Sequence, residues 1–73
     1  MNDYSKYLVI NSEVRFGKAC IIGTRISVFD VLGWFASGMT LEDILEDYPE
    51  LTKEQIQACL AYAANREHKL LVA

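Results

Sequence analysis

The sequence predicts a mainly α protein in which short N-terminal β-strands precede three helices. Apolar runs rich in β-branched residues lie before residue 27, whereas the apolar residues that follow recur with helical spacing. In addition, three segments of the second part begin with a residue pattern typical of helix starts. We therefore expect the 73 residues to form a single domain, with a strand hairpin over residues 1–26 and a helical bundle over residues 27–73.

The predicted strands are Tyr7–Ile10 and Ala19–Ile22, both short and rich in residues that favour extended backbone. Between them, Phe16-Gly17-Lys18 offers a turn. We expect two or three short strands in this region, arranged as a hairpin.

Each predicted helix begins with a hydroxyl residue followed three positions later by an acceptor side chain. The pairs are Ser27 with Asp30, Thr40 with Asp43, and Thr52 with Gln55. In such a capping box the hydroxyl satisfies an unpaired N–H of the first turn, and the acceptor reaches back to the cap. Gly38 and Pro49 provide the corresponding stops, because glycine adopts the left-handed conformation and proline cannot continue a helix.

Residues spaced i, i+3, i+4, i+7 along each helix define the predicted core. They are Val28, Val31, Leu32, Phe35, Leu41, Ile44, Leu45, Tyr48, Ile56, Cys59, Leu60 and Ala63. The last two helices, joined by the tight turn at Tyr48-Pro49-Glu50-Leu51, match a helix-turn-helix in which the third helix is the usual DNA reader. A plain three-helix bundle gives the same periodicity, so both interpretations stay open.

The size and composition of the chain favour a binding protein that associates with another polypeptide. A chain of this length buries only about 60% of its unfolded surface, which makes a second copy an expected source of further burial. A hydrophobic content of 52% and a net charge of −3 exclude a disordered chain. With neither a signal peptide nor a membrane-spanning run, we expect a cytoplasmic protein.

Enzymatic chemistry lacks its usual residues in this sequence. A glycine-rich phosphate loop, a His-x-x-x-His pair and two inward carboxylates are all missing. Cys20 and Cys59 have no second ligand at metal-binding spacing, and we expect both to be small buried hydrophobes. We therefore predict no catalytic residue, no metal site and no cofactor.

Several short motifs resemble a known family. Gly17-Lys18 is followed by Gly23-Thr24-Arg25, and later come Tyr48-Pro49-Glu50-Leu51-Thr52 and Tyr62-Ala63-Ala64. In combination these resemble the small bacterial family called domain of unknown function 433, over nearly the whole chain. The resemblance implies a homeodomain-like or winged helix-turn-helix fold and membership of type II toxin–antitoxin modules as the antitoxin, encoded beside a PIN-like nuclease. Ala19 departs from the proline common in the family, which loosens the turn.

Charge is distributed unevenly along the chain. Between Val14 and Phe29 there are three cations and no acid, whereas the segment Leu41–Leu51 holds five acids and no cation. The acids occupy the helix side opposite the core and would repel a phosphate backbone. One interpretation is a solvated surface that aids solubility; the other is a docking surface for a basic RNA-binding nuclease.

Nucleic acid is expected to bind weakly if the chain acts alone. The candidate contacts are Arg15, Lys18, Thr24, Arg25, Lys53 and Gln57. Gly23-Thr24-Arg25 is either a phosphate-binding turn or plain connection geometry. The positions expected to point outward on the third helix include no arginine to read guanine: Glu54, Gln57, Ala58, Ala61 and Asn65. A sequence pI near 4.9 is contrary to the basic surface of most nucleic-acid-binding domains.

Protein contacts are expected on aromatic, acidic and small residues. The candidates are Phe29, Trp34, Glu42, Glu46, Ala58, Ala61, Tyr62 and Asn65. Trp34 and Phe29 flank the core stripe of the first helix, where they either meet the strands or anchor a subunit or toxin interface. Ala58, Ala61 and Asn65 offer a flat face for a second helix.

The resulting hypothesis is a dimeric, non-enzymatic antitoxin that binds and neutralises a PIN-like nuclease, with repression of its own operon as a further role. The alternatives are a stand-alone DNA-binding transcription regulator without a toxin and, third, a structural adaptor that only dimerises. The sequence leaves the dimer surface unassigned.

Overall fold

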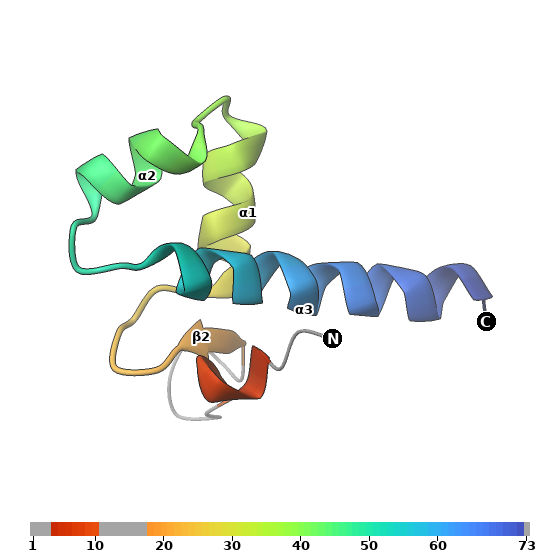
Figure 1. The fold of residues 1–73 in the computed structure, drawn as a ribbon. Coiled ribbons are helices and arrows are strands. Elements are labelled where there is room, and N and C mark those ends of the chain that lie inside the picture. Colours follow the sequence, from red (N-terminus) through yellow and green to blue (C-terminus); the bar gives the residue numbers. More distant parts are fainter. Residues whose placement is uncertain (1–3, 11–17, 73) are drawn as a thin grey trace.

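The computed structural model describes residues 4–10 and 18–72 and has strands before helices, as predicted (Figure 1). Its elements are the 3₁₀-helix η1 (Tyr4–Lys6), the strands β1 (Leu8–Ile10) and β2 (Ala19–Ile21), and the helices α1 (Val28–Ala36), α2 (Leu41–Asp47) and α3 (Lys53–Val72). The protein is thus mainly helical, with two short antiparallel strands followed by three helices. The short helix η1 was not predicted.

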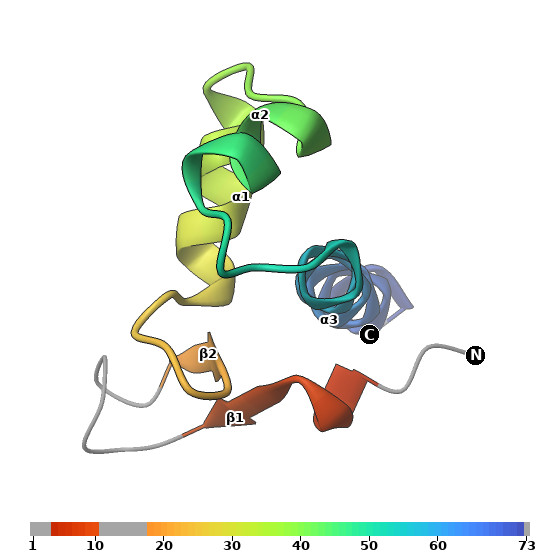
Figure 2. The same cartoon turned by 60° about the vertical axis from the view of Figure 1, so that its left-hand side comes forward.

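The two strands pair with Leu8 opposite Ile21, Val9 opposite Cys20 and Ile10 opposite Ala19. The other side of β2 is covered by the chain that leads into α1, because the Ile21 N–H donates to the Ile26 carbonyl at 2.8 Å. The sheet lies at the N-terminal end of α1 and below α3 (Figure 2). Of the predicted turn, Phe16 and Gly17 lie outside the described residues, as does Arg15.

All three predicted capping boxes are confirmed. In α1 the Asp30 N–H donates to the Ser27 hydroxyl at 3.0 Å, and the Ser27 N–H donates to the Asp30 carboxylate at 2.9 Å. The same reciprocal pairs form at the starts of α2 and α3. Gly38, with φ of +103°, follows α1 in the left-handed conformation expected of a helix stop.

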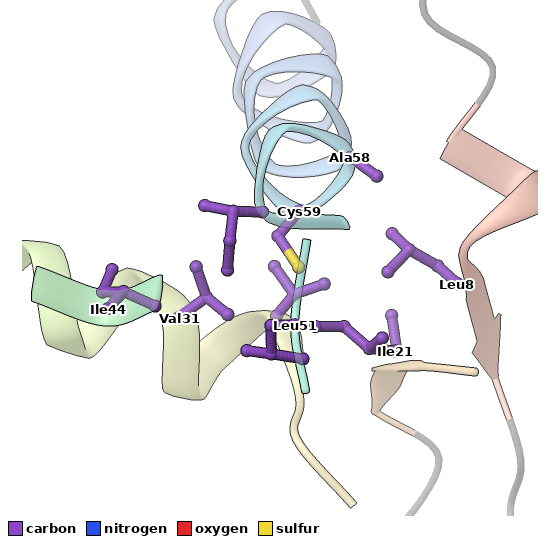
Figure 3. Close-up of a cluster of buried hydrophobic side chains, with 10 residues drawn as sticks. Leu8, Ile21, Val31, Ile44, Leu51, Ala58 and Cys59 are labelled. Atoms are coloured by element: carbon purple, nitrogen blue, oxygen red, sulfur yellow. The ribbon is translucent and has the colours of Figure 1, made fainter. Parts of the chain in front are cut away.

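The core lies where α1, α2 and α3 meet each other and the sheet (Figure 3). Ile21, Val31, Ile44, Ile56 and Cys59 are fully buried there. The predicted core residues other than Leu60 are either buried in this cluster or packed against it. Both cysteines are buried and free, as predicted.

The predicted orientation of α3 is wrong at two positions. Leu60, expected in the core, is 40% exposed, whereas Ala58, expected on an outer face, is only 4% exposed. The cause is a segment distant in sequence: η1 and β1 pack along this side of α3, and Ala58 points toward Leu8 (Figure 3). Periodicity alone does not show that η1 and β1 cover this flank, so the buried stripe is rotated from the one predicted.

Candidate interaction surfaces

The strongest charged surface is the acidic face, which we define as Glu42, Glu46, Asp47 and Glu50. All four side chains are exposed on α2 and the turn that follows it. The remaining acid of this segment, Asp43, accepts the Thr40 N–H at 3.0 Å and so closes the cap of α2. The two predicted partner-binding acids, Glu42 and Glu46, are four residues apart and therefore lie on the same side of α2.

A second surface, the cationic corner, consists of Lys18, Arg25 and Phe29 at the opposite end of α1 from α2 (Figure 1). Phe29 is 67% exposed, and the Lys18 Nζ lies 4.7 Å from the centroid of its ring. This distance is within the range of a cation–π interaction. The next acid along the chain, Asp30, accepts the Ser27 N–H at the start of α1.

The turn that presents Arg25 is built by Thr24. Its hydroxyl donates to the Ile21 carbonyl at 2.8 Å and accepts the Ile26 N–H at 3.0 Å. Gly23 precedes it with φ of +83°, a conformation that other residues rarely adopt. Thr24, a predicted nucleic-acid contact, thus has its hydroxyl occupied within the turn, and Arg25 is the exposed cation that this turn carries.

Trp34, a predicted interface residue, is used inside the molecule. Its ring stacks on Tyr48 with centroids 4.3 Å apart and planes 16° apart. This stack joins the last turn of α1 to the end of α2, and both residues pack against the core. Trp34 is half-buried as a result, and Phe29 is the aromatic residue of α1 that stays widely exposed.

The predicted small-residue face of α3 is also largely occupied. Ala58 is buried beside β1. Tyr62 meets Tyr4 edge to face at 5.4 Å, and the Asn65 side-chain amide donates to the Tyr4 hydroxyl at 3.2 Å. Tyr62 and Asn65 hold η1 against α3, and Ala61 beside them is half-buried.

The proposed DNA-reading side of α3 is open but sparsely charged. Lys53 and Gln57 are both exposed near its start, and Leu60 lies one turn beyond Gln57. Glu50, from the acidic face, precedes Lys53 by three residues. Any duplex that approached Lys53 would therefore meet carboxylates on the adjoining turn.

Exposed aliphatic residues on the hairpin were missed by the sequence analysis. Val9, Ile10 and Ile22 are 45%, 62% and 49% exposed. The continuous apolar run Leu8-Val9-Ile10 is typical of a strand covered on both faces, so it gave no indication of exposure. Polar alternation, which marks a half-exposed strand, is missing here.

Metal-ligand clusters and membrane-spanning helices are not found in the described part of the chain. Burial raises the pKa of the Cys59 thiol from 9.0 to about 11, which keeps it protonated at neutral pH. Within residues 4–10 and 18–72, no three His, Cys, Asp or Glu side chains gather to hold a metal ion. None of the helices over that span is long and apolar enough to cross a membrane.

The model of the family described as protein of unknown function (DUF433) matches residues 8–63 of the chain. The chain belongs to the DUF433 family. It is also similar to the crystal structure of a DUF433 member from Anabaena variabilis ATCC 29413, with 29% identity and a TM-score of 0.79. That match covers 85% of this chain and 61% of the other. No curated protein matches the chain.

Proposed function

We propose that this DUF433 chain is a non-enzymatic antitoxin that binds and neutralises a PIN-like nuclease. The family resemblance implies this role, and one observation carries it physically. The acids of α2 and the cationic corner lie at opposite ends of α1, so opposite charges are separated along the molecule (Figure 1). The acidic face favours a basic protein surface as its partner.

The acidic face resembles a nucleic acid backbone in its charge. Four exposed carboxylates are displayed along fewer than ten residues of chain. A nuclease that binds RNA needs a basic surface for the phosphates, and that surface attracts the carboxylates for the same electrostatic reason. An antitoxin bound there would exclude the RNA substrate.

The decisive experiment is co-expression with the product of the adjacent reading frame. We expect the two proteins to co-purify and the RNase activity of the partner to be lost in the complex. Replacing Glu42 and Glu46 together by Gln should lower the association rate constant about tenfold at low salt, and the difference should vanish near 1 M salt, where charges are screened within about 3 Å.

Glu54→Gln is a matched control for the Glu42 change. Glu42 and Glu54 are each the second residue of their helix, and both are exposed. Each lies between the threonine and the acceptor residue of a capping box. The control therefore loses the same charge and the same helix-dipole contribution outside the acidic face. Unchanged association in the double variant, or an equal loss for Glu54→Gln and for Glu42→Gln measured singly, would refute the role of this face.

DNA binding is the second candidate function, supported by the exposure of Lys53 and Gln57 on the helix that follows the α2–α3 turn. Because the acidic face adjoins that helix, we propose that operator DNA is held firmly only when a basic partner contributes cations. Tight, salt-sensitive binding of the isolated chain to its own promoter would instead favour the stand-alone regulator.

A further inference from the structure

The strand β1 has an open edge. The sheet consists of β1 and β2 alone, and the other side of β2 is closed by Ile26 and Ser27. On its outer side β1 has no strand partner within residues 4–10 and 18–72, and it runs along the margin of the molecule (Figure 2). An edge of this kind presents backbone groups that can pair with another strand.

The hydrogen-bond pattern shows which groups of β1 point outward. The Ile22 N–H donates to the Tyr7 carbonyl at 2.8 Å, so residue 7 and, by alternation, Val9 direct their backbone groups toward β2. The N–H and C=O groups of Leu8 and Ile10 therefore point to the open edge. The same alternation holds on β2, where the Ile21 N–H points away from β1 and donates to the Ile26 carbonyl.

The open edge is apolar, and although β1 is short, it carries neither a charge nor a proline. Val9 and Ile10 are 45% and 62% exposed. The segment from Tyr7 to Ile10 contains no charge and no proline, the two devices that commonly prevent strands from pairing edge to edge. An uncharged strand also meets no electrostatic repulsion from an identical strand.

We propose that a second copy of the chain pairs with this edge, β1 against β1, in antiparallel orientation. In the symmetric register Leu8 faces the partner's Ile10, and the outward N–H and C=O groups of both residues are satisfied. The two-fold axis then passes between Val9 and the partner's Val9, which face each other. The two hairpins form one four-stranded sheet. This register covers the exposed side chain of Val9 with its own copy.

A second copy fits the edge better than a foreign strand because the edge is self-complementary. The outward groups sit on two residues that flank Val9 symmetrically, so a two-fold axis through Val9 pairs all of them. The paired segment is short, and we expect a dimer that dissociates on dilution. The proposal concerns the isolated chain and does not depend on the antitoxin role.

Cysteine cross-linking tests the register. Residues that face each other across a non-hydrogen-bonded position have Cα atoms about 4.5 Å apart, close enough for a disulfide. Under mild oxidation we expect Val9→Cys to form a disulfide-linked dimer at least tenfold faster than Ile22→Cys, scored on non-reducing gels. Ile22 is a matched control because it is also apolar and 49% exposed, but it lies away from the proposed axis.

A second substitution tests the backbone pairing. Ile10→Pro removes an outward N–H while leaving the bonds between β1 and β2, and it should raise the dimer dissociation constant at least tenfold in sedimentation experiments. Folding of the variant is checked by circular dichroism. A monomeric wild-type chain at about 100 μM, equal cross-linking at positions 9 and 22, or unchanged dimerisation of folded Ile10→Pro would overturn the proposal; the micromolar range is chosen for a modest interface.

Discussion

Replacing Ile56 and Leu60 separately by Ala tests the position of the buried stripe on α3. Ile56 is 0% exposed, and its replacement removes three carbon atoms from the core. At about 0.8 kcal/mol per buried CH₂ the lost transfer free energy is about 2.4 kcal/mol, and a residual cavity raises the loss to about 3–4 kcal/mol. A chain of this size has a free energy of unfolding of about 4–11 kcal/mol, so the change should remove a large fraction of it.

Leu60→Ala is the variant whose loss of stability is compared with that of Ile56→Ala. It also removes three carbons, one turn further along α3, but from a side chain that is 40% exposed. We expect a loss of about 1 kcal/mol, because less surface returns to water and no closed cavity forms. With an m value of about 1 kcal/mol/M, urea midpoints followed by circular dichroism should fall by about 3 M for Ile56→Ala and about 1 M for Leu60→Ala. A loss for Leu60→Ala as large as that for Ile56→Ala would refute the observed stripe and restore the one that periodicity predicts, in which both residues are buried.

Three further predictions concern the cap, the buried thiol and the exposed turn. Ser27→Ala should lower the free energy of unfolding by about 1–2 kcal/mol in thermal melts, more than Thr52→Ala, because Ser27 is fully buried and Thr52 is exposed. The raised pKa of Cys59 predicts stability that is constant below pH 9 and falls by about 1.4 kcal/mol per unit as pH rises from 9 toward 11, a slope missing in urea titrations of Cys59→Ala. In thermal melts, Arg25→Ala should leave the free energy of unfolding unchanged within about 0.5 kcal/mol, whereas Thr24→Val, which loses both side-chain hydrogen bonds of the turn, should lower it by about 1–3 kcal/mol.

Local features of the fold could be predicted from the sequence. The capping boxes at Ser27, Thr40 and Thr52 formed as expected because each depends on residues three positions apart. The stop at Gly38 is equally local, since it follows from the conformational freedom of one residue. The strands Leu8–Ile10 and Ala19–Ile21 lie inside the predicted runs for the same reason.

Features that depend on distant contacts could not be predicted. Ala58 is buried because β1 and η1 lie beside it, and Tyr62 is engaged by Tyr4, which is 58 residues earlier in the chain. Helical spacing states which residues share a face, but not which neighbouring segment covers that face. The exposure of Val9 was missed for a related reason, since a continuous apolar run does not reveal that one side of the sheet is uncovered.

The candidate surfaces divide in the same way. Glu42, Glu46, Lys18 and Arg25 are exposed as expected, because charged side chains on short elements seldom find buried partners. Trp34 was expected either at an interface or against the N-terminal strands, and it instead stacks on Tyr48. An aromatic residue on the flank of a helix can pack inside the molecule or contact a partner. Which of the two occurs depends on where the next helix ends.

The two proposed associations are compatible because they use opposite ends of the molecule. The acidic face lies on α2 and the turn that follows it, whereas the open edge of β1 lies beyond the N-terminal end of α1 (Figures 1 and 2). Pairing through β1 would therefore leave both acidic faces of a dimer accessible. Two linked copies can engage two nuclease molecules, and a partner that is itself dimeric would be bound with a gain in avidity. Ile10→Pro should then weaken capture of a dimeric nuclease while leaving the affinity for a monomeric one unchanged, a difference that titration calorimetry can resolve.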